Sequence, residues 1–147
     1  METFGGTFPF YFPKHYKYLY PEKTATLEAY QKATEFDHSA ATAVTIGTFD
    51  GVHIGHRKII RRLIEVGKKK GLEPTILTFF PHPRMVLQKD SDIKLINTIA
   101  ERVMILEKTG IKNLIVYPFT MEFSRLSAKD FVENILVEKL HAKKVVI

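Results

Sequence analysis

Two histidines three residues apart, His53 and His56, are the residues of this 147-residue chain whose types and spacing best suit chemistry. They lie in the stretch "AVTIGTFDGVHIGHRKII" (residues 43–60), between an apolar run and a basic segment. An imidazole can donate hydrogen bonds, and such donors gain most where negative charge grows in a transition state. The start of a helix also attracts anions, so a histidine pair at that place favours phosphate chemistry.

Two other interpretations of the pair stay open. A zinc site needs three or four protein ligands, and no third ligand lies near His53 and His56 in the sequence, so we predict no metal site. A bare H-x-x-H spacing is otherwise typical of ordinary loop residues. The glycines around the pair, Gly47, Gly51 and Gly55, favour the phosphate interpretation, because they let the backbone turn tightly and approach a ligand.

The elements that must position these histidines alternate between two patterns. Runs rich in β-branched and aromatic residues predict strands at residues 43–47, 74–80, 113–119 and 143–147. A helical pattern separates each run from the next. Strands that alternate with helices in this way form right-handed crossovers, so the sequence predicts an α/β fold with a parallel sheet. In such a sheet ligands bind beyond the carboxyl ends of the strands, where His53 and His56 lie.

The helical segments carry recognisable start and stop signals. The first is basic and closes at Gly71. The second opens at Thr98 with Glu101 in a capping-box spacing and ends at Gly110. The third opens at Ser127. The apolar residues at helical spacing that we expect to be buried are Ile59, Ile60, Leu63, Ile64 and Val66 in the first helix, Ile99, Val103 and Leu106 in the second, and Phe131, Ile135 and Leu136 in the third.

The net charge of +6 is local. Residues 57–70 hold seven Lys and Arg against Glu65 alone, so this segment carries the whole excess. We predict a solvated basic helix face, with attraction to polyanions as a minor alternative, and no nucleic-acid partner. No apolar run approaches the length of about 20 residues that spans a bilayer, so we expect no membrane partner. The absence of cysteine fits a reducing, cytoplasmic compartment.

The first forty residues differ from the rest of the chain. Residues 4–20 are rich in aromatic residues broken by prolines and lysines, and they lack the pattern of a signal peptide. We predict an N-terminal leader over residues 1–40, partly disordered, with a short helix at residues 26–32. The globular domain is then expected to cover residues 41–147. An aromatic docking segment is the alternative for residues 1–22.

Three motifs together resemble one family. "TIGTFDGVHIGH" is similar to the signature of the nucleotidyltransferase superfamily with an H-x-G-H motif, and in this form it resembles the FAD synthetase domain of bacterial bifunctional riboflavin kinase/FAD synthetases. "TFFPHPRMVL" (78–87) and "FTMEFSRLSAKDFVENIL" (119–136) resemble two further segments of that family. The resemblance covers about residues 40–147 and implies a Rossmann-like sheet. Other cytidylyl- and adenylyltransferases share only the first motif.

The resemblance implies FMN adenylyltransfer, in which FMN attacks ATP with the assistance of Mg²⁺ and FAD and pyrophosphate form. It gives His53 and His56 the catalytic role of holding and stabilising the triphosphate. It places His82 on the flavin-phosphate side, although a loop histidine locked by prolines is an equal alternative. For Phe123 and Leu126 we favour a core position over one beside the flavin. The implied nucleotide-binding residues are Gly47, Thr48, Phe49, Asp50, Gly51 and Gly55, and those on the flavin side with His82 are Thr78 and Pro81.

The family pattern continues beyond "AKKVVI" with a G-x-D-F-x-F-G segment, a serine- and threonine-rich segment and a riboflavin kinase domain. We therefore expect a domain truncated after the fourth strand and incomplete for catalysis. In the superfamily's sheet order, 3-2-1-4-5, that strand would present an unpaired edge, which favours self-association. The alternatives are a non-catalytic nucleotide-binding or association module, and another cytidylyl- or adenylyltransferase of the superfamily.

Overall fold

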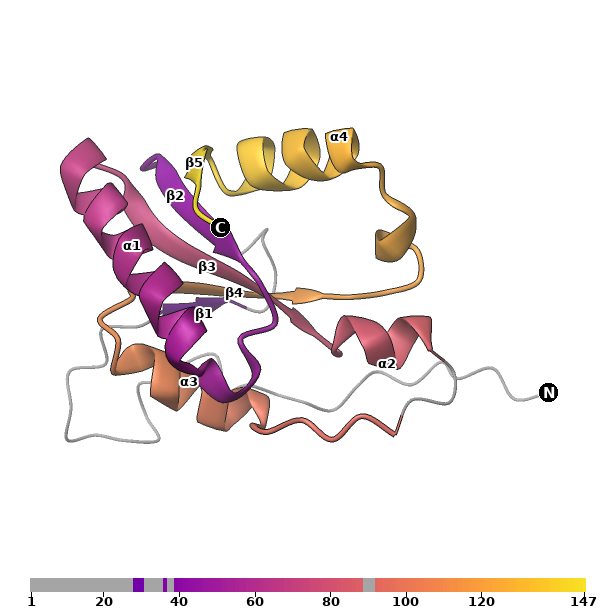
Figure 1. Ribbon diagram of the computed structural model, residues 1–147. Coiled ribbons are helices and arrows are strands. Elements are labelled where there is room, and N and C mark those ends of the chain that lie inside the picture. The colour runs from indigo at the N-terminus through magenta and orange to yellow at the C-terminus, as the bar shows by residue number, and fades with distance from the viewer. Residues whose placement is uncertain (1–27, 31–35, 37–38, 89–91) are drawn as a thin grey trace.

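A parallel sheet forms the centre of the computed structural model, which describes residues 28–30, 36, 39–88 and 92–147 (Figure 1). Its five strands lie in the order β1-β4-β3-β2-β5. Every strand pair is parallel, as the predicted crossovers require. The strands are β1 (Glu28–Tyr30), β2 (Thr42–Ile46), β3 (Glu73–Phe80), β4 (Asn113–Pro118) and β5 (Ala142–Val145).

Four of these strands match the sequence prediction within two residues at each end, and their order confirms the predicted arrangement. The fifth corrects it. A short helix was predicted at residues 26–32, but Glu28–Tyr30 form β1, which pairs with residues 113–115 of β4. A segment of three residues has too weak a preference of its own to set helix or strand, so pairing with the free edge of β4 makes it a strand. The aromatic residues 4–20 lie outside the described residues.

Helices cover both faces of the sheet (Figure 1). The helices α1 (Ile54–Lys70) and α3 (Ile99–Glu107) pack on one face. On the other face a single turn, α4 (Ala128–Asp130), continues into the π-helix η5 (Phe131–Lys139). The predicted fold class, a Rossmann-like α/β domain, is thereby confirmed.

Each central strand contributes to two apolar cores, because neighbouring residues of a strand point to opposite faces. One core lies beneath α1 and α3, and the other lies beneath η5. This explains why the central strands are continuous apolar runs rather than alternating ones. The adjacent pairs that divide between the two cores are Ala43 and Val44, Ile76 and Leu77, and Leu114 and Ile115.

The helix α1 has the predicted buried stripe and basic face. Ile60 and Leu63 are fully buried, whereas the lysines and arginines of residues 57–70 are exposed. Gly71 ends the helix in the left-handed conformation, with φ of 64°. The lysines of the last turn face the negative end of the helix dipole, which favours this orientation.

The predicted starts of the other two helices are confirmed, whereas α3 ends at Glu107, three residues before the predicted end at Gly110. Thr98 and Glu101 form a reciprocal capping box at the start of α3. The side chain of Ser127 accepts a hydrogen bond from the backbone N–H of Asp130 at 3.0 Å and caps α4. The apolar residues expected in these helices are buried or half-buried.

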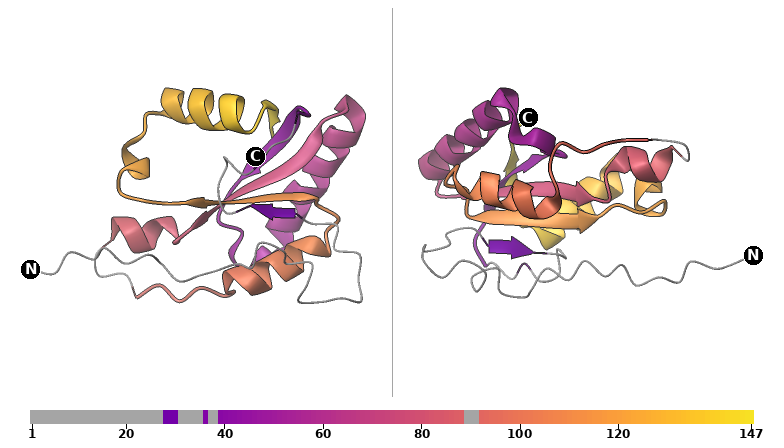
Figure 2. Two further views of the ribbon diagram at one scale, coloured as in Figure 1. Left: turned by 180° about the vertical axis from the view of Figure 1, so that it is seen from behind. Right: turned by 90° about the horizontal axis from the view of Figure 1, so that it is seen from below.

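Three short helical turns follow the carboxyl ends of three neighbouring strands (Figure 2). They are η3 (Asp50–Val52) after β2, α2 (Pro83–Leu87) after β3 and η4 (Phe123–Arg125) after β4. The sequence analysis did not predict them as helices. They lie at the edge of the sheet where ligands of parallel α/β folds bind.

Candidate active site

The turn between β2 and α1 is strained where it precedes the histidines. Phe49, Gly51 and Val52 all have positive φ, at 51°, 72° and 40°. Glycine adopts such values freely, but a β-branched residue such as Val52 does so at an energetic cost. Burial holds it there, since the side chains of Phe49 and Val52 are each 1% exposed. Strain of this kind is typical of functional turns.

His53 and His56 lie together at the start of α1, as the sequence predicted. Their rings stack with centroids 3.6 Å apart and an angle of 22° between the planes. His53 is the N-cap of α1, and its Nδ1 accepts a long hydrogen bond of 3.4 Å from the backbone N–H of His56. A neutral His53 therefore carries its proton on Nε2, which is left as a donor.

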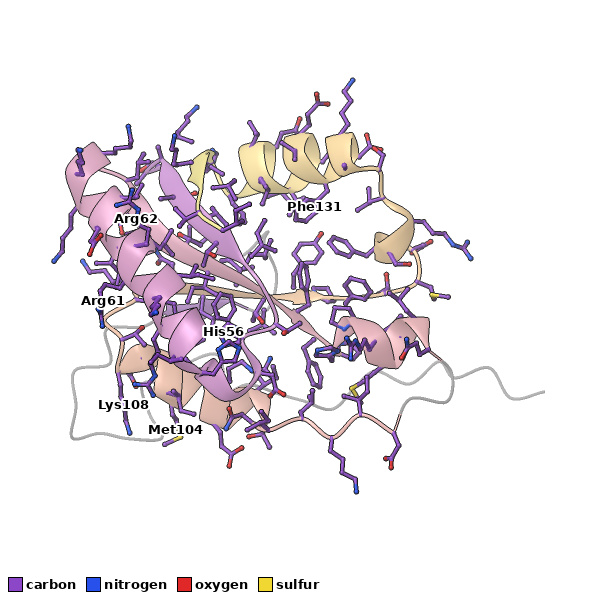
Figure 3. The ribbon with its side chains drawn as sticks, viewed as in Figure 1. His56, Arg61, Arg62, Met104, Lys108 and Phe131 are labelled. Atoms are coloured by element: carbon purple, nitrogen blue, oxygen red, sulfur yellow. The ribbon has the colours of Figure 1, made fainter. Side chains whose placement is uncertain are left out.

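His56 is half-buried at the start of α1 (Figure 3). Burial lowers its pKa, and the nearby His53 and Arg102 lower it further, against the opposing effect of Asp50. Its ring also contacts Phe49, with 4.9 Å between centroids. Its Nδ1 is buried and has no hydrogen-bond partner within the described part of the chain. Even a neutral imidazole carries hydrogen on one ring nitrogen, and that nitrogen can donate a hydrogen bond to an anion.

The helix start beside the pair offers further donors. Ile54 and Gly55 occupy the first two positions of α1, where no carbonyl of the helix lies four residues back. A Cβ on Gly55 would lie 3.1 Å from His53 Cε1, so the glycine leaves room for the ring. The positive end of the dipole of this 17-residue helix points to the same place. The arrangement is suited to bind an anion.

Asp50 connects the turn to the segment before α3. Its carboxylate accepts hydrogen bonds from the backbone N–H of Ile96, at 3.0 and 3.1 Å to its two oxygens, and of Asn97 at 3.1 Å. Burial opposes its ionisation, but these hydrogen bonds and the charges of Arg102 and His82 outweigh burial and lower the pKa of Asp50. Asp50, which was predicted to shape the nucleotide loop, thus uses an ionised carboxylate to hold that loop to the segment before α3.

Arg102 is the site residue that the sequence analysis missed. Its side chain is 2% exposed, and its Nη2 lies 3.4 Å from Asp50 Oδ1. The signal was present in the spacing, because Arg102 falls between Ile99 and Leu106 on the buried stripe of α3. A buried arginine needs a partner, and only the fold brings Asp50 to it from 52 residues away.

The residues predicted on the flavin side follow β3. Thr78 is buried, and its hydroxyl donates to the carbonyl of Thr48 at 3.1 Å, so these two residues join β3 to the turn after β2. His82 caps α2, and its Nδ1 accepts a hydrogen bond of 3.2 Å from the backbone N–H of Arg84. Pro81 precedes it and is half-buried, as are Gly47, at the end of β2, and His82 itself.

His82 lies within electrostatic reach of the first motif. Burial lowers its pKa, Asp50 opposes that effect, and the positive charges of Arg102 and Arg84 reinforce it. The second motif therefore meets the first at the carboxyl ends of β2 and β3.

An aromatic cluster stands beyond β3 and β4. Phe123 contacts Tyr117 at 4.9 Å, Phe119 at 5.4 Å, Phe79 at 5.6 Å and Phe131 at 5.9 Å between ring centroids. Figure 3 shows Phe131 on the side of its helix that faces these rings. Phe123 is half-buried and packs against the core beneath η5, so the choice between a core position and one beside the flavin stays a prediction. The core position is wrong for Leu126, which caps the end of η4 and is 39% exposed.

Metal ligands do not gather in the described residues. No group of three or more His, Cys, Asp or Glu side chains there could hold a metal ion. Near the histidine pair, the carboxylate of Asp50 is already occupied by backbone N–H groups and Arg102.

The comparisons with known proteins agree with the first motif and its surroundings. The family model of FAD synthetase matches residues 35–147. The bifunctional riboflavin kinase/FMN adenylyltransferase of Listeria monocytogenes is 38% identical over 104 residues, which are 70% of this chain and 33% of that protein. The proteins of the same name from Buchnera aphidicola (strain Sg) and Escherichia coli (strain K12) are 36% and 32% identical, over 72% and 68% of this chain. The chain thus spans about a third of the length of these relatives, 32 to 34%.

A solved structure shares the fold. A crystal structure titled as a macrolide-efflux protein from Streptococcus pneumoniae has a TM-score of 0.71 and 25% identity, over 80% of this chain and 46% of that one. In the part of the chain that the structure describes, no helix is long and apolar enough to cross a membrane.

The match of the family model to residues 35–147 includes all three motifs. The chain therefore belongs to the FAD synthetase family.

Proposed function

We propose that this chain is the nucleotide-binding part of an FMN adenylyltransferase, whose parent enzyme is also a riboflavin kinase. The observation that supports this most directly is the stacked pair of His53 and His56 at the start of α1, beyond the carboxyl end of β2. Hydrogen-bond donors and a helix dipole meet there, which is what the phosphates of a nucleotide require.

The proposed reaction transfers AMP from ATP to FMN. A phosphate oxygen of FMN attacks the α-phosphorus of ATP and forms a new P–O bond. The bond between the α-phosphorus and the oxygen that bridges it to the β-phosphorus breaks, and pyrophosphate leaves with that electron pair. No covalent intermediate with the protein is needed. Positioning and charge stabilisation are therefore the main contributions of the protein.

In this proposal each histidine acts as a hydrogen-bond donor. Nε2–H of His53 and the imidazole of His56 donate to phosphate oxygens as negative charge grows on them. The backbone N–H groups of Ile54 and Gly55 add donors that need no reorganisation. In this proposal the nucleotide lies against the strained turn around Phe49 and Gly51, with Thr48 and Gly47 beside it.

The flavin is proposed to lie beyond β3 and β4. His82 is the N-cap of α2, and because its Nδ1 accepts a hydrogen bond there, Nε2 is the nitrogen that can donate. In this proposal Nε2 donates to the phosphate of FMN. The aromatic cluster of Tyr117, Phe119 and Phe123 offers ring faces and edges on which a flat flavin ring can stack. The sequence analysis did not find Tyr117 and Phe119 as site residues, because aromatic residues of a strand are as typical of a core.

Mg²⁺ belongs to this proposal as part of the substrate. It prefers phosphate oxygens and water to an all-protein cage, so it enters with ATP as the MgATP complex. We propose that the reaction takes place in the cytoplasm, with which the lack of cysteine in the sequence is compatible.

Self-association through β5 is a separate part of the proposal. The strand lies at one end of the sheet order, and its outer edge pairs with no other described strand. Lys143 and Lys144 are exposed on it, and lysines on an edge oppose pairing. We therefore expect weak association that strengthens with salt, which sedimentation at several protein concentrations would detect. A monomer at every concentration would contradict it.

Formation of FAD from FMN and MgATP tests the proposed function. The chain is assayed as it is, and beside it an extended chain that continues through the segments that the family pattern places after Ile147. FAD formation by either one supports the proposal. If neither forms FAD, but calorimetry shows that the chain binds ATP, the chain is a nucleotide-binding module and the proposed transfer is wrong.

A further inference from the structure

Arg102 is buried in a way that stability alone does not explain. Its Nη2 donates to Asp50 Oδ1 and to the carbonyl of Asn97, each at 3.4 Å, and its Nε has no partner among the described residues. Burying a charge with incomplete pairing is costly, and apolar side chains of similar volume in place of a whole buried ion pair are often as stable or more so. A residue kept in this arrangement has another task.

That task concerns three segments that meet at one carboxylate. Asp50 belongs to η3, the N–H groups of Ile96 and Asn97 belong to the segment before α3, and Arg102 belongs to α3 itself. The side chain of Ile96 also packs against the turn, since a Cβ on Gly51 would lie 2.9 Å from Ile96 Cδ1. The ion pair and these contacts therefore join the turn to α3.

The same turn leads directly to the histidines. Gly51 and Val52 connect Asp50 to His53, and the carbonyl of Val52 accepts a hydrogen bond of 3.2 Å from Nε of Arg57 in α1. A shift of Asp50 therefore reaches the N-cap of α1 within three residues. We propose that Arg102 is a positioning residue, which fixes Asp50 on α3 and through Asp50 holds His53 and His56 in their stacked arrangement. This inference rests on the proposed function only for the conclusion that the held pair then serves phosphates.

The electrostatics of the site provide a signature for the test. The charged and titratable groups that act on His56 are His53 beside it, Asp50 in η3 and Arg102 in α3. Asp50 in turn feels His82 from the segment after β3. Arg102 lowers the pKa of His56, and Asp50 raises it. Removal of each partner must therefore move the titration of His56 in opposite directions.

The experiment follows the imidazole resonances of His56 by NMR as the pH changes, in the chain as it is and without ligand. In Arg102→Met the titration of His56 moves to higher pH, and in Asp50→Asn it moves to lower pH. The control is Val103→Ala, which truncates a side chain that is 1% exposed on the same helix and removes no charge or hydrogen bond of the ion pair. It lowers the melting temperature but leaves the titration where it is in the wild type.

Hydrogen exchange adds a readout of position. The amides of Ile96 and Asn97 exchange about tenfold faster or more in Arg102→Met, measured relative to the amide of Leu63 in α1. In Val103→Ala that ratio stays as in the wild type. If Arg102→Met does not fold, Arg102→Lys keeps the charge on a shorter, single-point donor. It is then expected to keep the titration of His56 near the wild-type pH while it still accelerates exchange at Ile96 and Asn97.

The inference is overturned if Arg102→Met loses stability as Val103→Ala does but moves neither the titration nor the exchange ratio. It is also overturned if Arg102→Lys behaves as the wild type in both readouts, because a point charge would then suffice. Neither readout uses ATP or FMN. A chain that forms no FAD would thus contradict the proposed function and leave this test of Arg102 standing.

Discussion

Gly55 offers a perturbation that separates stability from activity. It occupies the second position of α1, where alanine is favoured over glycine by about 0.5 to 1 kcal/mol. The gain in helix propensity alone would raise the melting temperature of Gly55→Ala by about 2 to 4 °C. The tight contact of the new Cβ with His53 offsets part of this gain, so we expect a melting temperature that is higher or unchanged. A gain in stability would be the opposite of what most substitutions produce.

The same substitution disturbs the histidine pair. The new Cβ would lie 3.1 Å from Cε1 and 3.2 Å from Nδ1 of His53, so the ring must move by a few tenths of an ångström. The exposed ring of His53 can swing away, and it then loses its 3.6 Å stack on His56 and its long capping hydrogen bond. A donor displaced by this much costs about tenfold or more in adenylyl transfer.

Gly67 provides the matched control, since it undergoes the same chemical change further along the same helix. A Cβ on Gly67 would lie 2.7 Å from Pro74 Cγ and 2.8 Å from the backbone oxygen of Leu72. Backbone and a proline ring cannot rotate away, so Gly67→Ala is expected to destabilise the fold by about 1 to 3 kcal/mol. It leaves the histidines in place.

Thermal unfolding of the chain and FAD formation by the extended chain measure the two effects. The reasoning predicts that Gly55→Ala keeps its stability and loses activity, and that Gly67→Ala loses stability and keeps its activity at a temperature where it is folded. Full activity in Gly55→Ala, or a loss of more than about 1 kcal/mol of stability in it, would refute the packing argument.

Two further predictions concern stability. Because the pKa of Asp50 is lowered in the folded state, its carboxylate contributes stability above the ordinary value of 3.8, and that contribution is lost as the pH falls through the lowered value. The difference in unfolding free energy between the wild type and Asp50→Asn should thus be constant from about pH 5 to 7 and shrink below about pH 4 in acid titrations; a difference that grows toward low pH would contradict this. Thr98→Ala removes the capping box of α3 and should cost about 1 kcal/mol in urea unfolding, whereas Thr98→Ser should cost much less.

The sequence predicts the architecture well where the pattern is long. The runs that became β2 to β5 contain enough β-branched and aromatic residues to define strands, and Thr98 with Glu101 defines a helix start. The strand β1 could not be predicted, because three residues take their conformation from the edge of β4. Leu126 could not be assigned either, since its exposure depends on how the chain leaves η4.

The candidate site divides in the same way. His53, His56 and the glycines around them are close in sequence, so their convergence follows from one turn and one helix. Arg102 and the aromatic cluster are joined to the site only by tertiary contacts, such as the pair of Asp50 and Arg102. The placement of the predicted nucleotide-binding and flavin-side residues around ligands stays a prediction.

The central claim is that His53 and His56 stabilise the phosphates during adenylyl transfer. The most direct measurement is the rate of FAD formation by the extended chain with His53→Ala and with His56→Ala, together with the melting temperature of each variant. We predict that both variants melt close to the wild type and form FAD roughly a hundredfold more slowly, as expected for the loss of one transition-state donor. Rates equal to the wild type in folded variants would contradict the account.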